Sequence, residues 1–546
     1  MQITENNPAS SDSGKRYRIA FFLLLAVVFL FRLWFVSTLP LSGDEAYHWE
    51  WSRHLALGYY DHPGLTAYLI FLCTSLFGGS TELTVRLGAL LMLTGTSVIC
   101  FFLARQVTAD RGGSRESAEK AGLIAGALII ITPVYAFLSC YMSTDPVLIF
   151  CWSLALYLLY QAFQKEKWRY WIGAGIVFGF AMQSKFLAFF MLGAIGLFVL
   201  ISPEDRKWLK RPHGYVAFVC ALLVFSPFIW WNAKHEWATF MFNFVDRQKQ
   251  HALSFEHVPI SVLAQLLSLS PLLLPLAVHA IYRSIRDWAR NRNRMSLFLG
   301  LNSLVPLGYF VYLSFRWQVD PHWPAAGWIA AVVYLSCYWA EREWNKETKL
   351  VRRMRMAAIG LCLFIAVLMP IVVHISPVWV QKTSRKISWK HSEQIDIEKH
   401  SERYGWPELG RWVQDVHDEM LADQGPDGKG VFVVSDQYGL SASIAFYTPD
   451  QITTHLWTPL RTKTHGENYR YWDDYPALKG QDAIFVVKKE GRLDRKVPFI
   501  EKHFKRTGEQ ECLPVFEDNI RMRRFFLVRL YDFDGSTPAF RRKNKK

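Results

Sequence analysis

The sequence predicts an α-helical polytopic membrane protein of about eleven or more transmembrane helices, followed by a C-terminal α/β domain outside the membrane. Three observations predict this class. Of the 546 residues 51% are apolar, apolar stretches recur along the first two thirds of the chain, and the basic excess (net charge +15) lies between those stretches. Basic residues that alternate with apolar stretches are typical of membrane topology and not of nucleic-acid binding, so no nucleic-acid partner is expected.

The membrane core is predicted over residues 19–375. A polar leader over 1–18 precedes it and is expected in the cytoplasm, and the first apolar stretch lacks a small-residue cleavage site, which indicates a retained anchor. Bilayer-crossing helices need roughly 17–25 residues. The predicted spans are 19–39, 84–105, 121–138, 146–164, 170–184, 186–202, 214–231, 259–282, 295–314, 324–341 and 355–375.

The basic loops decide the orientation of these spans. Lys and Arg concentrate at 15–18, 165–169, 206–211, 283–294 and 349–355. The positive-inside rule places such loops in the cytoplasm. Counting the short apolar stretch 64–77 as a span would put the later basic loops on the wrong side, so we expect a helix lying on the outer surface. The short spans 170–184 and 186–202 predict a break at Lys185 on the outer face.

The character of the chain changes near residue 376. Long apolar runs end there, and 376–540 is predicted to form a periplasmic α/β domain. Helical spacing covers 406–421, whereas 431–434, 483–487 and 525–528 are typical of buried strands. Helices that alternate with strands predict three layers. The basic tail 541–546 is expected to be disordered and to lie near anionic lipid.

Ionisable side chains gather at the predicted outer face. Asp44 and Glu45 follow the first span, Asp61 and His62 come sixteen residues later, and Asp145 lies between two spans. Lys185, the loop 232–258 and the stretch 320–324 fall on the same side. Charges at a membrane boundary are costly unless they face a cavity, a partner or water. The sequence therefore predicts a functional site at this face.

These motifs resemble the GT-C class of membrane glycosyltransferases. The Asp-Glu pair after the first span, Tyr-Tyr-Asp-His-Pro shortly after it and Thr-Asp at the second outer loop are similar to the bacterial relatives of protein O-mannosyltransferases, a branch that includes the lipid A aminoarabinose transferase. The resemblance covers the whole chain. It implies a polyprenyl-phosphate sugar donor, transfer at the periplasmic face of the bacterial inner membrane, and lipid A or lipopolysaccharide core, a glycan or a protein as acceptor.

The resemblance also implies roles for single residues. Asp44 matches the family's first outer-loop aspartate, which acts as base or positions the acceptor, and Asp145 matches the second. Asp61-His62 falls where the aminoarabinose branch has Glu-Lys before two prolines, the acid helping to bind a metal and the lysine contacting phosphate. Here the lysine is replaced by His62 and the second proline by Gly64.

One further departure concerns the sugar. An arginine that the aminoarabinose branch carries three residues after its aspartate is Tyr47 here. The changes at His62, Gly64 and Tyr47 together argue against aminoarabinose as the transferred sugar.

Glycosyl transfer requires a base, a cation for the leaving phosphate, and stabilisation of an oxocarbenium-like transition state. Asp44 is the expected base, with Glu45 either supporting it or facing away. Asp145 either joins the catalytic carboxylates or caps the helix that begins at Pro146. The candidate phosphate ligands are Lys185, Arg53, Arg247 and His62. The alternative for Lys185 is a lysine that snorkels to the interface.

Aromatic and histidine residues complete the predicted site. The expected substrate pocket consists of Tyr47, Tyr59, Tyr60, His322 and Trp323, whose indole could stack on a sugar ring. The sequence identifies no certain cofactor. A divalent metal is a candidate, with His251, His257 and His322 as ligands together with Asp61. The alternative is that these are ordinary loop histidines.

Two other functions are compatible with a polytopic membrane protein. A transporter or flippase is expected to show internal repeats and charges at the bilayer midplane, and this sequence shows neither. A receptor anchored by its membrane part would not need so many spans. The sequence therefore favours an enzyme. Its expected partners are a lipid-linked sugar donor and the surrounding membrane lipids.

Overall fold

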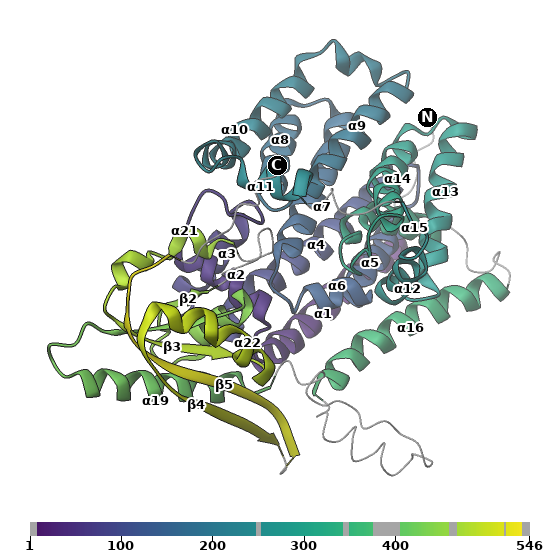
Figure 1. Cartoon of the computed structure of the whole chain (residues 1–546). Coiled ribbons are helices and arrows are strands. Elements are labelled where there is room, and N and C mark those ends of the chain that lie inside the picture. The colour runs from purple at the N-terminus through teal and green to yellow at the C-terminus, as the bar shows by residue number, and fades with distance from the viewer. Residues whose placement is uncertain are drawn as a thin grey trace, which may run out of the picture.

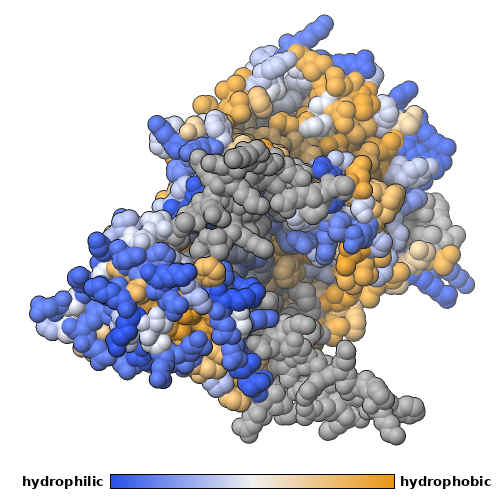
Figure 2. All heavy atoms as spheres, in the orientation of Figure 1, coloured by the Kyte–Doolittle hydropathy of each residue, from blue (hydrophilic) through white to orange (hydrophobic). Residues whose placement is uncertain are grey.

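The computed structural model describes residues 8–246, 253–341, 349–374, 404–457, 467–517 and 520–537. Two parts are visible in Figure 1, a large helical part and a smaller α/β part that lies against one end of it. Hydrophobic residues dominate the visible surface of the helical part, and hydrophilic residues dominate that of the α/β part (Figure 2). This distribution fits a multi-pass membrane protein with one part outside the bilayer.

Each predicted span is helical in the structure, although two of them are interrupted. The longer helices are α1 (Pro8–Ser37), α4 (Glu82–Asp110), α5 (Arg115–Ile131), α7 (Thr144–Lys165), α8 (Trp168–Met182), α9 (Phe189–Ile201), α10 (Pro212–Lys234), α12 (Val258–Leu269), α13 (Leu273–Asn291), α14 (Arg294–Ser314), α15 (Ala325–Glu341) and α16 (Lys349–His374). The predicted span 121–138 ends early, because Pro133 opens a separate short helix α6 (Pro133–Leu138) after Thr132 takes an extended conformation.

Five of the described helices are long and apolar enough to cross a membrane: 14–37 of α1, α4, α7, α10 and α14. The predicted span 259–282 is wrong as one continuous helix, because α12 and α13 meet at 94°. Ser270, at φ +86°, breaks the helix one residue before Pro271. A residue that precedes proline is disfavoured in helical geometry, which explains the break.

Two short helices lie between α1 and α4. The first, α2 (Gly43–Arg53), starts with a capping box in which Ser42 Oγ accepts from the Glu45 amide at 3.2 Å and the Glu45 carboxylate accepts from the Ser42 amide at 3.0 Å. The second, α3 (Leu65–Leu76), has 12 residues. At 1.5 Å per residue it reaches only about 18 Å, too short to cross a hydrocarbon core of about 30 Å.

The α/β part contains a five-stranded mixed sheet. Its strands are β1 (Val431–Ser435), β2 (Thr454–Leu456), β3 (Asp482–Val487), β4 (Phe504–Glu517) and β5 (Ile520–Phe533), in the order β2-β1-β3-β5-β4. β1 runs parallel to β2 and β3, whereas β5 pairs antiparallel with β3 and β4. The three strands expected from their apolar runs are present, but β2 and the long β4 were not predicted.

Helices cover both faces of this sheet. α19 (Trp406–Gln424) and α20 (Tyr438–Tyr447) pack on one face with Val433, whereas α22 (Glu490–Ile500) packs on the other with Phe432 and Val434. The alternation along β1 follows the two-residue period of a strand. The predicted basic tail 541–546 and the start of the predicted domain at 376 lie outside the described residues.

The α/β part contacts the helical part mainly through α20, which lies against α2. Gly43 and Gly439 approach so closely that a Cβ on Gly43 would lie 3.1 Å from the Gly439 Cα, so both positions need glycine. Tyr447, also on α20, accepts a hydrogen bond from the Leu41 amide at 2.7 Å and donates one to Glu82 at 3.2 Å. The α/β part therefore meets the helical part at the first turn of α2, where the candidate carboxylates lie.

Candidate active site

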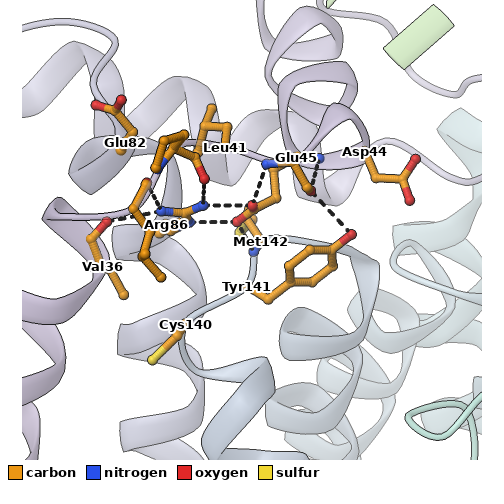
Figure 3. A network of polar contacts seen from close by, with 12 residues as sticks. Val36, Leu41, Asp44, Glu45, Glu82, Arg86, Cys140, Tyr141 and Met142 are labelled. Carbon is orange, nitrogen blue, oxygen red and sulfur yellow. Dashed lines mark hydrogen bonds and ion pairs between the residues drawn. The ribbon is translucent and has the colours of Figure 1, made fainter. Parts of the chain in front are cut away.

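Asp44 occupies the first turn of α2 with an exposed side chain. Its carboxylate accepts a hydrogen bond from the hydroxyl of Tyr438 on α20 at 2.8 Å. The Asp44 carbonyl accepts from His48 Nδ1 at 2.7 Å. In Figure 3 the Asp44 carboxylate points away from the buried polar network beside it. Asp44 can therefore reach a substrate hydroxyl while the α/β part holds it from one side.

Glu45 points in the opposite direction, into a buried ion pair with Arg86 of α4 (Figure 3). The guanidinium contacts both Glu45 oxygens, at 2.7 and 2.8 Å, and donates to the carbonyls of Val36, Leu39 and Pro40. The Met142 amide donates to Glu45 Oε1 at 3.1 Å. The sequence left two alternatives for Glu45, that it supports Asp44 or that it faces away. In the structure the Glu45 side chain faces away from Asp44.

The charge state of Glu45 follows from this network. Burial acts to raise the pKa of Glu45, but the Arg86 guanidinium and the Ser42 and Met142 amides outweigh it and hold the pKa below its ordinary value of 4.5. The buried bidentate pair between Glu45 and Arg86 joins α2 to α4. The hydrogen bonds of the same two side chains to backbone groups connect this pair to the end of α1 and to the loop at 139–143. Glu45 thereby holds the first turn of α2, which carries Asp44, in place.

We expect Arg86→Met to destabilise the protein strongly, because it leaves the Glu45 carboxylate buried without its counter-charge. Breaking such a pair typically costs about 3–5 kcal/mol. The apparent melting temperature of the detergent-extracted protein measures the effect. Arg211→Met is the control, since Arg211 and its partner Glu166 are 45% and 38% exposed, and such surface pairs contribute about 1 kcal/mol or less.

The same pair predicts a pH dependence. The folded-state pKa of Glu45 is depressed, so its contribution to the free energy of unfolding is complete above its unfolded value near 4.5. That contribution is lost as the pH falls through the folded-state pKa. Without Arg86, burial raises the pKa of Glu45. The difference in melting temperature between the native protein and Arg86→Met should therefore narrow as the pH falls from the raised pKa of the variant to the depressed pKa of the native protein, and a constant difference would contradict this role.

A second charged group combines Asp145, Lys185 and His322 from three separate segments. Lys185 Nζ donates to both oxygens of Asp145 at 2.8 Å, and His322 Nε2 lies 3.5 Å from the same carboxylate. The cap of α7 is supplied by Ser143, whose hydroxyl accepts from the Asp145 amide at 3.3 Å. The Asp145 carboxylate is therefore committed to Lys185 instead of capping α7.

The location of Lys185 matches the predicted break. It lies between α8 and a short 3₁₀ helix, Phe186–Ala188, that precedes α9, and its side chain is 17% exposed. Burial lowers the pKa of His322, although the negative charge of Asp145 opposes that effect. The charges of Asp44 and Asp320 act on the pKa of His322 in the same direction as Asp145, against the effect of burial. All three carboxylates therefore lie within electrostatic range of this ring.

Lys185 also lines a cavity of about 570 Å³. Its polar lining consists of Lys185, His62, Asn243 and Arg316, and the remaining walls are aromatic and aliphatic: Phe186, Leu187, Phe189, Phe190, Phe240, Phe244, Tyr309, Phe310, Tyr312, Leu313, Trp317 and Trp323. Such a cavity suits a ligand with a long apolar chain and a single anionic head. Of the predicted residues, Lys185, His62 and Trp323 line it.

Arg316 and Asn243 were not predicted as cavity residues. Arg316 follows α14 on the predicted outer face, so a basic residue that departs from the positive-inside pattern is a signal that could have identified it. Asn243 lies in the predicted outer loop and donates to the Asp61 carbonyl at 3.0 Å. No sequence pattern marks Asn243.

Asp61 and Tyr47 form a buried group with the α/β part. The Tyr47 hydroxyl donates to Asp61 at 2.8 Å and accepts from the Asn468 amide at 2.6 Å, and Asn468 Oδ1 accepts from the Tyr60 amide at 2.6 Å. Burial, together with the Asp61 carboxylate, raises the pKa of Tyr47 well above its usual range. Asn468 therefore joins the α/β part to the Tyr60-Asp61 loop, a role that the sequence did not indicate.

The remaining predicted residues lie elsewhere. Arg53 pairs with Glu50 at 3.4 Å and stands over Trp49, and it does not line the cavity. The Tyr59 hydroxyl donates to the Trp51 carbonyl at 2.8 Å, so Tyr59 stabilises its own loop. The Tyr60 ring packs against Phe242.

Of the predicted metal ligands, Asp61, His257 and His322 lie in the described part of the chain. Among the described residues, no group of three or more His, Cys, Asp or Glu side chains could hold a metal ion. His257 directly precedes α12 and joins no such group. His251 and Arg247 lie outside the described residues.

Comparison with known proteins supports the predicted resemblance. Residues 61–231 match the family model described as dolichyl-phosphate-mannose-protein mannosyltransferase. A curated relative, the lipid A galacturonosyltransferase RgtD of Rhizobium johnstonii, is 27% identical over 331 residues, which is 58% of this chain and 66% of that protein.

Two crystal structures share the fold. ArnT from Cupriavidus metallidurans in the apo state superposes with a TM-score of 0.60 at 14% identity, over 94% of this chain and 98% of that one. The same protein bound to undecaprenyl phosphate gives a TM-score of 0.58 with the same coverage and identity.

Proposed function

We propose that this chain, a membrane glycosyltransferase of the GT-C class by its family match, its curated relative and its fold, transfers a sugar from a polyprenyl phosphate to an envelope acceptor. The observation that carries the proposal is the cavity of about 570 Å³, whose walls are mainly apolar and whose few polar lining residues include Lys185, the partner of Asp145. A polyprenyl phosphate has the matching form, a long apolar chain with a phosphate head. The bound ligand of the ArnT structure, undecaprenyl phosphate, belongs to the same chemical class.

The proposed reaction is a single displacement at the anomeric carbon. The acceptor hydroxyl oxygen attacks that carbon, the bond between the carbon and the phosphate oxygen breaks, and the electron pair leaves with the polyprenyl phosphate. Asp44 takes the proton of the acceptor hydroxyl. Lys185 stabilises the negative charge that grows on the departing phosphate, and the nearby carboxylates favour an oxocarbenium-like transition state. Trp323 lines the cavity where its indole can pack on the sugar.

The acceptor that we propose is lipid A or a related envelope glycan. The curated relative is named for the transfer of galacturonic acid to lipid A, and Tyr47 in place of the aminoarabinose-branch arginine argues for a different sugar from aminoarabinose. A protein is the alternative acceptor, since the matching family model is described by protein mannosylation.

Mass spectrometry of the envelope tests the acceptor. Compared with the parent, lipid A or surface glycans from a deletion strain are expected to lack one sugar. Complementation with the native gene should restore that sugar, and complementation with Asp44→Asn should not. An unchanged lipid A beside a protein that loses a glycan would assign the protein acceptor. To separate an enzyme from a transporter, the purified chain is incubated in detergent with donor and acceptor, because transfer without a sealed membrane is not transport.

We further propose that the site and the α/β part face the periplasm of the inner membrane, that about eleven spans build the core, and that α3 lies along the outer surface. The 29 residues of α4 separate Ser80 from Asp110 by about 43 Å, more than the hydrocarbon thickness of about 30 Å. In a cysteine-free background, we expect an impermeant thiol reagent added outside to label Ser80→Cys and not Asp110→Cys. Labelling of residue 80 only from the cytoplasmic side would contradict the orientation.

The hydroxyl of Tyr438 is expected to position Asp44 for catalysis. Tyr438→Phe removes its 2.8 Å hydrogen bond to the carboxylate, and a hydrogen bond to a charged group contributes about 1.5–3 kcal/mol, or about 10–100-fold in rate. We expect kcat to fall by that factor with little change in the KM for the donor. Tyr531→Phe is the control, because Tyr531 packs under Arg506 in the same part of the protein, away from Asp44. A rise in KM alone would contradict the positioning role.

A further inference from the structure

A second cavity, of about 400 Å³, lies at the opposite end of the helical part. Arg111, Arg283, Arg286 and Arg290 line it, and we call it the arginine cavity. Arg111 follows the last residue of α4, whose first turn lies beside the candidate site, and α4 is about 43 Å long. α15 likewise starts next to Trp323 and ends at the arginine cavity. The two cavities are therefore separated by about the thickness of a bilayer.

The charges in the arginine cavity are only partly balanced. Arg111 pairs with Glu341 at 3.0 Å and with Asp287 at 3.5 Å. Arg283, Arg286 and Arg290 recur at the spacing that puts them on one side of α13, and among the described residues none of these three forms an ion pair. Two carboxylates face four guanidinium groups, so the cavity carries excess positive charge.

Aromatic rings contact three of the guanidinium groups, since Arg286 stands 6.0 Å over the Tyr282 ring and two others stand over tyrosines of α15. Arg283 stands 5.0 Å over the Tyr338 ring, and Arg111 stands 5.3 Å over Tyr334. A cation–π contact orients the guanidinium while its N–H groups stay available as donors. Planar guanidinium groups bind the oxygens of a phosphate in a bidentate manner, and several of them around one cavity favour such an anion.

We propose that the arginine cavity binds the phosphate ester head group of an anionic membrane lipid. The position of α13 supports a lipid over a soluble phosphate, because Val278 and Tyr282, earlier on the same helix, are 51% and 57% exposed and apolar or amphipathic. The helix thus carries a surface suited to acyl chains before it reaches the arginines. Basic cavities between membrane helices at the interface are a recurrent type of site for anionic head groups.

This site is independent of the transfer reaction. It lies at the end of α4, which is about 43 Å long, opposite the end beside the candidate site, and it shares no lining residue with the cavity at Lys185. A lipid that bridges α4, α13 and α15 at this end would stabilise their packing from the opposite leaflet. The site would therefore affect the stability of the helical part without taking part in chemistry.

Native mass spectrometry of the purified full chain tests the proposal. The probes are phosphatidylglycerol, zwitterionic phosphatidylcholine and inorganic phosphate, each titrated while retained molecules and the melting temperature are measured. Arg283→Gln/Arg286→Gln removes two cavity charges, and Lys167→Gln/Lys210→Gln removes two exposed charges from helix junctions that do not line the cavity. Each basic contact near an anionic membrane surface contributes about fivefold, so the arginine double variant should weaken phosphatidylglycerol binding about 30-fold, and the lysine double variant should not.

The remaining outcomes are also decisive. A conservative Arg283→Lys/Arg286→Lys variant should retain part of the affinity, which separates lost charge from lost folding. Equal weakening by both glutamine double variants, or equal retention of the anionic and zwitterionic lipids by the native protein, would overturn the proposal. Inorganic phosphate that binds tightly and is lost in the arginine double variant would overturn the lipid assignment and assign a soluble phosphate.

Discussion

Asp44→Asn is expected to lower the rate of sugar transfer by about 10²–10⁴-fold, the usual loss when a positioned general base is removed. The side chain keeps its size and can still accept the hydrogen bond from Tyr438, so folding and insertion should not change. What is lost is the ability to take the proton of the acceptor hydroxyl. The reason to choose Asp44 over its neighbour is geometric, because Glu45 already binds Arg86 and two backbone amides.

The measurement is single-turnover transfer by the purified variant with donor in excess over its dissociation constant. Asp415→Asn is the matched control, since it removes an exposed carboxylate from α19, on the α/β part. We expect the control to retain full activity. Near-normal turnover by Asp44→Asn would instead move the base to Asp145 or Asp61, the other carboxylates predicted at this face.

The helical elements were predictable because a helix that crosses a bilayer must be long and apolar, and this requirement is visible in composition. The break at Ser270 was missed because Pro271 lies inside a long, mainly apolar stretch without charged residues, and hydropathy does not report the bend that proline imposes. The strand β4 was missed because much of it is polar and exposed, so it lacks the apolar run that identified β1, β3 and β5.

The charged group at Lys185 was predictable only in part. The predicted topology placed Asp145 and Lys185 on the same face of the membrane, and in the structure they form an ion pair. The opposite directions of Asp44 and Glu45 could not be assigned from the sequence, although neighbours on a helix point about 100° apart. The partner that settles the role of Glu45 is Arg86, which occupies the next long helix and has no local sequence signal.

Contacts between the helical part and the α/β part could not be predicted from the sequence. Tyr438 and Asn468 reach Asp44 and the Asp61 group from the α/β part, 394 and 407 residues further along the chain. Single-sequence patterns report local periodicity, and they carry no information about which loop of one part meets which helix of another. The consequence is functional, because a domain predicted only as an addition to the core supplies a hydrogen bond to the candidate base.

Lys185→Met is expected to weaken binding of the lipid donor and to lower turnover by about 10²–10³-fold, the typical loss of one well-placed donor to a developing negative charge. The lysine ammonium has three N–H donors, and the two oxygens of Asp145 occupy two of them at 2.8 Å. The third can bond a phosphate in the mainly apolar cavity that Lys185 lines, where the low dielectric strengthens the contact.

Met preserves most of the lysine stem, so Lys185→Met separates charge from packing, and Lys185→Arg should restore part of the binding. Lys234→Met is the matched control, because Lys234 is an exposed cation at the end of α10 that does not line the cavity.

Repeating Lys185→Met in an Asp145→Asn background distinguishes the two roles of Lys185, binding the donor phosphate and neutralising Asp145. If Lys185 only neutralised Asp145, its loss would have little effect once that charge is removed. Because Lys185 is expected to contact the phosphate, donor binding should still fall in the double variant, and an unchanged donor affinity there would transfer the role to His62 or Arg316.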